Sequence, residues 1–429
     1  MELASKIFKG DRVIWVIFLL LTLVSMVEVF SATSTLAYKN ATHWGPIVRH
    51  ASFLLVGWAV VLVLHNVPYR LMAAGILLLP VSILMLLVTP FIGISANDAH
   101  RWLSILGFQV QPSEFAKLGS IIFIAFMLSR RGRFTENQIF RTIVGGVGIT
   151  CALILPENFS TAAMLFAVCM LMMFIGELPL KKLLQLAGIL CAAGAIFFCV
   201  LKFTPKDVVM NYLPDRFATW QARVDRFGDD ASNYNAKGEY VISDENYQVS
   251  HAKIALARGG LFGQMPGHGQ QRDFLPQAYS DFIYAIIIEE LGFIGGVAVL
   301  LLYLILLVRV GIIAKQCDKL FAKYLVLGCG LLLVVQALAN MAVAVNLIPV
   351  TGQPMPLVSR GGTSTVISCV YIGIILSVSR FGANIGNEED ELPVEEPKSD
   401  NDEDLPAVEE RTDAFVSVEE PSQQIEKNV

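Results

Sequence analysis

Ten apolar runs alternate with shorter polar segments along most of the chain. They cover about residues 13–30, 51–64, 71–94, 112–128, 139–155, 160–175, 183–203, 282–308, 324–347 and 363–378. A helix needs roughly 17–25 predominantly apolar residues to cross a membrane, and most of the runs approach or reach that length. The pattern therefore predicts an all-α polytopic membrane protein with ten transmembrane helices.

The composition of the 429 residues agrees with this fold class. They are 55% hydrophobic and only 16% charged, with a mean hydropathy of +0.59, whereas a soluble domain carries about 25% charged residues. The first apolar run is longer than the roughly 7–15 residues of a signal-peptide core, so we expect an uncleaved first helix. We see no nucleotide-binding P-loop and expect no nucleic-acid partner.

Charge divides the chain into a basic body and an acidic tail. Residues 388–429 hold 16 acids against three bases, so the net charge of −5 leaves +8 for the rest. We predict a ten-helix membrane domain over 1–382, with a large extracytoplasmic loop over 203–280 between helices 7 and 8. Amphipathic helices are expected in that loop, and 383–429 is expected to be a disordered cytoplasmic tail.

The positive-inside rule predicts the orientation. If the N-terminus is cytoplasmic and the helices alternate, fifteen Lys and Arg residues fall on the cytoplasmic side, against four in the short outer loops. Both termini are then inside, and the protein is a multi-pass protein of the cytoplasmic membrane. Asp281 lies at the outer end of the eighth helix.

The stretch FLPQAYSDFIYAIIIEELGFIGG, residues 274–296, places Asp281 where a polar loop becomes an apolar run. The alternative to a functional role is that Asp281 caps its helix. Glu289 and Glu290 follow within the run, and a continuous helix would put Glu289 roughly 12 Å deeper in the membrane. Placing an ionised group at that depth costs about 2.5–3.5 kcal/mol, so acids kept there usually have a function. The structural alternative is that Glu289 and Glu290 hold helices together by hydrogen bonds or an ion pair.

Two further segments carry polar groups toward the same outer surface. Glu114 and Lys117 are three residues apart in AHRWLSILGFQVQPSEFAK, so they share a helix face and can form an ion pair. Arg101 precedes them and suits a lipid-headgroup interface. The loop NLIPVTGQPMPLVSRGGTS, residues 346–364, is rich in Pro and Gly and contains Arg360. The structural alternatives are a buried ion pair for Glu114 and Lys117 and a tight turn for the loop 346–364. The functional alternative is that these residues form a site for a lipid-linked phosphate.

These segments together resemble the SEDS family (shape, elongation, division and sporulation), whose members are polytopic peptidoglycan glycosyltransferases that polymerise lipid II. The matching pieces are RWLSILGFQVQPSEFAKLG, NYQVSHAKIALARGGLFG, FLPQAYSDFIYAIIIEELGFIGG and NLIPVTGQPMPLVSRGGTS. Within the family, the VFSATS ending of the first helix is most similar to the septal branch, FtsW, and implies septal wall synthesis in cell division.

The resemblance implies roles for particular residues. Asp281 matches the family's essential acid and is expected to be the catalytic general base. The expected substrate-binding residues are those matching other family motifs or adding charge nearby: Arg101, Glu114, Lys117, Arg258, Ser359, Arg360, Gly361 and Gly362. Several positions depart from the family pattern. Arg360 replaces the usual Tyr and adds a cation near the site, and Asn158 stands where many members have an acid.

The family's reaction implies partners and cofactors. The 4-hydroxyl of an acceptor GlcNAc would attack C1 of a donor MurNAc, releasing undecaprenyl pyrophosphate. The seven cysteines lack metal-ligand spacing, so we expect no metal site and no tightly bound cofactor, although Mg²⁺ or Mn²⁺ could be shared with the pyrophosphate. The chain has no transpeptidase nucleophile motif, so a class B penicillin-binding protein and other division proteins are expected partners. The alternatives are a lipid II flippase and a non-catalytic division scaffold.

Overall fold

The computed structural model describes residues 8–32, 45–96, 99–105, 108–204, 217, 221, 241–243, 246–275 and 278–382. These residues belong to one compact unit that extends from residue 1 to residue 387. The predicted acidic tail and most of the predicted large outer loop lie outside the described residues.

Every one of the ten apolar runs forms a helix. The helices are α2 (Arg12–Ala32), α4 (Gly45–Leu64), η1 with α5 (Tyr69–Leu77, Leu78–Ile92), α6 (Pro112–Ser129), α7 (Glu136–Ile154), α8 (Phe159–Ile175), α9 (Leu180–Phe203), α13 (Ile283–Lys315), α14 (Leu320–Ala344) and α15 (Thr363–Phe381). Within the described part of the chain, nine spans are long and apolar enough to cross a membrane, and the 17-residue α8 is shorter. The chain is therefore a multi-pass helical membrane protein, as the apolar pattern predicts.

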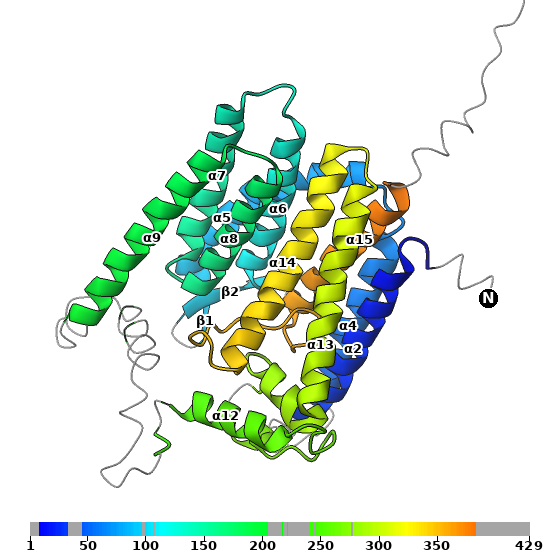
Figure 1. Ribbon diagram of the computed structural model, residues 1–429, viewed down its shortest axis with the longest axis vertical. Coiled ribbons are helices and arrows are strands. Elements are labelled where there is room, and N and C mark those ends of the chain that lie inside the picture. Colours follow the sequence, from blue (N-terminus) through cyan, green and yellow to red (C-terminus); the bar gives the residue numbers. More distant parts are fainter. Residues whose placement is uncertain are drawn as a thin grey trace, which may run out of the picture. The chain divides into compact units, whose positions relative to one another are not determined.

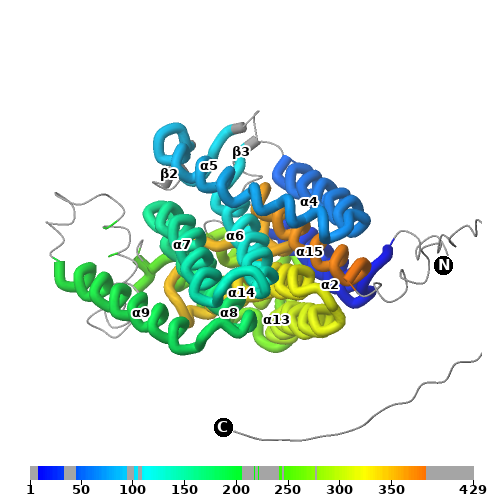
Figure 2. The backbone as a smooth tube through the Cα atoms, turned by 90° about the horizontal axis from the view of Figure 1, so that it is seen from above, coloured from blue at the N-terminus to red at the C-terminus, as the bar shows by residue number. Residues whose placement is uncertain are grey.

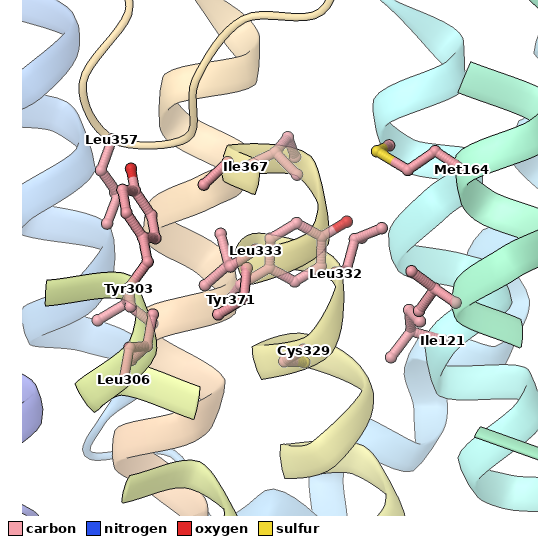
Figure 3. Close-up of a cluster of buried hydrophobic side chains, with 14 of the residues drawn as sticks. Ile121, Met164, Tyr303, Leu306, Cys329, Leu332, Leu333, Leu357, Ile367 and Tyr371 are labelled. Atoms are coloured by element: carbon pink, nitrogen blue, oxygen red, sulfur yellow. The ribbon is translucent and has the colours of Figure 1, made fainter. Parts of the chain in front are cut away.

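Helix α14 lies at the centre of the bundle, packed against α6, α8, α13 and α15 (Figure 2). The buried core follows from this arrangement, because Tyr303 of α13, Cys329 of α14 and Tyr371 of α15 meet in one apolar cluster (Figure 3). By contrast, α9 buries little of its surface, as expected for a helix that faces lipid. Helix α12 (Tyr247–Gly259) lies across one end of the bundle (Figure 1). The prediction of a helix in this part of the segment before α13 is confirmed.

The segment between α5 and α6 departs from the all-α prediction. It forms a three-stranded antiparallel sheet of β1 (Ile94–Ala96), β2 (Ala99–Ile105) and β3 (Phe108–Val110). In β2 and β3 the register pairs Leu103 with Val110. The paired strands satisfy one another's backbone groups, and β2 carries Arg101.

Helix α13 is broken at Gly292, so the apolar run 282–308 does not form one continuous helix, although the part from Ile283 through Glu289 is helical. Gly292 has φ 73° and ψ −176°, a conformation that is essentially restricted to glycine. The segment before the break folds back along the segment after it, because the Tyr284 hydroxyl donates to the carbonyl of Gly296 at 3.1 Å. In a continuous helix these groups, twelve residues apart, would be about 18 Å apart. Asp281 directly precedes this returning segment, so it lies at the end that is remote from the break.

Replacing Gly292 by alanine is expected to destabilise the fold. An added Cβ would lie 2.4 Å from both the Gly263 nitrogen and the Leu261 carbonyl oxygen, and the backbone conformation itself costs a non-glycine residue about 1–3 kcal/mol. The melting temperature of the detergent-solubilised protein should fall. Gly311→Ala in the same helix is the control, since its Cβ would meet nothing within 4 Å. A Gly292→Ala protein as stable as the control would contradict the break.

Candidate functional site

Asp281 lies between α14 and the loop before α15. The Asn340 side-chain amide donates to the Asp281 carbonyl at 3.0 Å, and the Ser280 hydroxyl donates to Asp281 Oδ1 at 2.9 Å. The Oδ2 atom of Asp281 faces Gly352: a Cβ added to Gly352 would lie 3.7 Å from this oxygen. The N-cap residue of α13 is Phe282 and not Asp281. The carboxylate is half-buried and has a glycine on one side.

The loop before α15 is tied to the residues preceding Asp281. Ser359 accepts a hydrogen bond from the Met355 amide at 2.8 Å and donates to the Ser280 carbonyl at 2.6 Å. The Arg360 amide donates to the Tyr279 carbonyl at 2.9 Å, and the Arg360 guanidinium lies 5.2 Å from the centre of the Tyr279 ring. The structure thus brings two of the predicted site residues, Ser359 and Arg360, to Asp281.

The two glycines of this loop lead the backbone into α15. Gly362 occupies the N-cap position with φ 56°, and a Cβ on Gly361 would collide with the Ser364 hydroxyl. Burial lowers the pKa of the half-buried Arg360 from its usual value; Tyr279 opposes this shift, and Arg49 adds to it. The loop 346–362 contains no helix.

Glu114 and Lys117 form the predicted ion pair, at 2.8 Å, in the first turns of α6. Both side chains are buried, Lys117 completely, and the Lys117 ammonium also donates to Gln336 Oε1 at 3.0 Å. The Gln336 amide in turn donates to the Pro354 carbonyl at 2.9 Å. The ion pair therefore supports the loop beside Asp281 through Gln336 of α14.

Sequence reasoning missed Gln336 and Asn340, which connect these groups. They lie four residues apart on one face of α14, and Asn340 donates to the Gln353 carbonyl at 2.8 Å as well as to Asp281. Two amides at this spacing in an otherwise apolar helix were the available signal, because polar side chains in a membrane helix usually have partners.

Arg101 occupies a different cleft. Its Nε donates to the Glu157 carbonyl at 3.0 Å. The cleft is lined by residues of α5, β2 and the ends of α6, α7 and α8: Leu86, Thr89, Arg101, Gln111, Pro112, Ser113, Leu153, Ile154, Glu157 and Asn158. Asn158 caps α8 through the Thr161 amide at 3.1 Å, while its buried Nδ2 has no protein partner. Thr161 accepts a hydrogen bond from Gln353, so this cleft adjoins the loop that contacts Asp281.

Arg258 is not brought into this group. It lies near the end of α12, is exposed, and donates to Gln270. The predicted charge cluster is therefore divided into the Asp281 site, the Arg101 cleft and the Arg258 surface. Among the described residues, no three His, Cys, Asp or Glu side chains converge in the manner of a metal site. A divalent ion at Asp281 would take most of its ligands from a bound molecule.

Comparison with known proteins supplies the context for this geometry. A family model of cell cycle proteins, FtsW, RodA and SpoVE, matches residues 11–384. A probable peptidoglycan glycosyltransferase FtsW of Geobacter sp. (strain M18) is 31% identical over 86% of this chain and 96% of its own. Stage V sporulation protein E of Bacillus subtilis (strain 168) is 28% identical over 88% of this chain and 99% of its own.

Solved structures share the fold at lower identity. A chain of a peptidoglycan synthase complex that coordinates polymerization and crosslinking has a TM-score of 0.66 and 22% identity, over 86% of this chain and 98% of that chain. The rod shape determining protein RodA of Thermus thermophilus has a TM-score of 0.59 and 22% identity, over 87% of this chain and 97% of that chain. At this identity, the similarity extends to the helical membrane fold.

Proposed function

Because this chain belongs to the FtsW, RodA and SpoVE family of cell cycle proteins, we propose that it is a peptidoglycan glycosyltransferase that polymerises lipid II at the outer face of the cytoplasmic membrane. Curated relatives with this activity in their names match most of the chain. The observation that carries the assignment of the site is the placement of Asp281, held by its backbone and by Ser280 while one carboxylate oxygen faces Gly352.

In the proposed reaction, Asp281 acts as general base. Its carboxylate accepts the proton of the acceptor GlcNAc 4-hydroxyl as that oxygen forms a bond to C1 of the donor MurNAc. The bond between C1 and the pyrophosphate oxygen breaks, the configuration at C1 inverts from α to β, and undecaprenyl pyrophosphate leaves. General-base assistance of this kind typically contributes about 10²–10⁴-fold.

The cations have different parts in this proposal. Arg360, half-buried beside Tyr279, and Arg101, in the adjoining cleft, are the ones that we assign to the charge developing on the pyrophosphate. Lys117 is fully buried against Glu114 and Gln336, so we assign to this pair the support of the loop that carries Arg360. Arg258 is assigned to the outer surface. A divalent ion shared with the pyrophosphate would be held mainly by the phosphate oxygens and would stabilise the charge of the leaving group.

We infer that all ten helices cross the membrane, since the 17 residues of α8 reach the lower end of the spanning range, roughly 17–25 residues. The excess of Lys and Arg favours cytoplasmic termini and an outward-facing Asp281. Septal wall synthesis and a class B penicillin-binding protein as partner are further parts of the proposal, supported by relatives named FtsW and by the synthase complex with a similar fold.

The flippase alternative is weakened by the positions of Glu289 and Glu290. A transport path needs charges that remain available across the membrane, but both carboxylates accept hydrogen bonds from backbone amides of the segment 267–271. These acids are therefore already satisfied by the protein itself.

The experiment is a polymerisation assay. The purified protein, reconstituted in vesicles with a class B penicillin-binding protein, is given labelled lipid II, and glycan strands are separated by gel electrophoresis. The proposal predicts a ladder of strands together with released undecaprenyl pyrophosphate. Translocation of a fluorescent lipid II without strand formation would overturn it in favour of transport.

A further inference from the structure

Two buried acids at the break in α13 have no role in the proposed reaction. Glu289 and Glu290 are both fully buried, at the end of the returning segment Ile283–Glu290. An uncompensated buried charge costs several kcal/mol, so their partners define what the structure requires of them.

The carboxylate of Glu289 binds the backbone of the outer segment that follows α12. Its Oε1 accepts from the amides of Gln270 and Gln271 at 3.0 and 3.1 Å, and its Oε2 also accepts from the Gln271 amide at 3.1 Å. Backbone amides are held in place by the chain itself, so this contact fixes the end of the returning segment against the segment 267–271. Charge-assisted hydrogen bonds of this kind are about twice as strong as neutral ones.

Glu290 connects the same segment to α2. Its Oε2 accepts from the Gly267 amide at 3.1 Å, and its Oε1 lies 3.5 Å from the Arg272 guanidinium and accepts from the Ser31 hydroxyl. Arg272 donates to Ser31 as well, at 2.5 Å. One carboxylate thus joins three parts of the protein at the break.

Backbone hydrogen bonds complete the contact around the break. On one side the amides of Gln264 and Met265 donate to the carbonyls of Glu289 and Glu290, both at 2.9 Å. On the other side the Phe293 amide donates to the Gly260 carbonyl at 2.9 Å. The two halves of α13 are therefore bound to a single outer segment, which satisfies backbone groups that the break leaves without helical partners.

The returning segment has Asp281 at its other end. It contains two turns of helix, and its inner end is held by Tyr284 against Gly296 and by Asn340 against the Asp281 carbonyl. Because only two hydrogen-bonded turns of helix separate the two ends, loss of the contacts of Glu289 would shift the segment and change the position of Asp281. A displacement of 1 Å at a reacting group can cost about 10²-fold in rate.

We propose that Glu289 and Glu290 are positioning residues for Asp281, acting through the returning segment of α13. The proposal rests on the function proposed above, because it assigns to these acids the placement of the general base. It also makes a statement about geometry that can be tested without any activity.

The geometric test is a disulfide between positions 288 and 296. A Cβ on Gly296 would lie 2.7 Å from Ile288 Cγ1, so Ile288→Cys with Gly296→Cys falls within the range of disulfide geometry. In a protein whose seven native cysteines are replaced, oxidation should consume both thiols, measured with a maleimide-polyethylene glycol reagent. The pair Leu300→Cys with Val308→Cys is the control, since eight residues in a continuous helix separate by about 12 Å. Failure of the first pair to cross-link would overturn the returning geometry.

The kinetic test compares alanine and glutamine at both acids. Glu289→Ala and Glu290→Ala should each lower kcat for lipid II polymerisation by about 10²-fold while KM changes little, and each should reduce the 288–296 cross-link. Glu289→Gln and Glu290→Gln keep one acceptor oxygen, so these variants should recover much of the wild-type kcat and of the 288–296 cross-link. Asp11→Asn is the matched control, because Asp11 is a buried acid that accepts backbone amides and pairs with Arg309 at the opposite end of α13.

The outcomes separate this proposal from the assignment of Asp281. A loss of kcat with an unchanged cross-link would overturn positioning through the segment, as would wild-type kcat in both alanine variants. If Asp281→Asn polymerises normally while the cross-link forms, the geometry stands but Asp281 is not the base, and the proposed role of the two acids falls with it.

Discussion

Lys117→Met is expected to lower the free energy of unfolding by about 3–5 kcal/mol, because it leaves the carboxylate of Glu114 buried without its cation. Gln336 also loses the hydrogen bond from the Lys117 ammonium, and this loss weakens the contact between the Gln336 amide and the Pro354 carbonyl. The measurement is equilibrium unfolding in mixed detergent micelles, with the denaturant midpoint compared between variants.

The double variant separates the ion pair from the packing. Glu114→Gln with Lys117→Met removes both charges, and replacing a buried pair by neutral side chains is often close to neutral for stability. We therefore expect the double variant to regain most of the stability lost by Lys117→Met. Two single losses that simply add in the double variant would mean that the side chains do not act as a pair.

Asp281→Asn is expected to leave the fold and lipid II binding nearly unchanged while it removes the base. Asparagine has the same shape and keeps an oxygen that can accept the Ser280 hydroxyl, and the contact with Asn340 uses the backbone carbonyl. The loss should appear in the rate of the chemical step, by about 10²–10⁴-fold, and not in the affinity for labelled lipid II in nanodiscs. A matching loss of affinity would indicate a binding role.

The ten helices were predictable because membrane burial imposes the same requirement on every residue of a run. The break at Gly292 was not, since the sequence is equally apolar on both sides of it and glycine is common in membrane helices. The consequence is large, because the break turns the segment next to Asp281 back along the rest of α13 and places Glu289 in contact with the segment 267–271. Glu289 and Glu290 accept hydrogen bonds from backbone amides. Every residue except proline has such an amide, so the sequence does not indicate which ones these acids contact.

The segments that form the candidate site could be predicted from the sequence, but most contacts between their side chains could not. The ion pair of Glu114 and Lys117 follows from their spacing on one helix face. Which cation accompanies Asp281 depends on how three distant segments pack, and the structure brings Arg360 but not Arg258 to it. The small sheet that holds Arg101 was missed because its three strands are too short for an apolar period to be detected.

The most direct test of Asp281 as the base is the initial rate of undecaprenyl pyrophosphate release from lipid II. Wild-type protein, Asp281→Asn and the control Asp11→Asn are measured side by side with the same transpeptidase partner and at equal amounts of folded protein. The account predicts that the control stays close to the wild-type rate and that Asp281→Asn is slower by about 10²–10⁴-fold. Release by Asp281→Asn at the wild-type rate would contradict it.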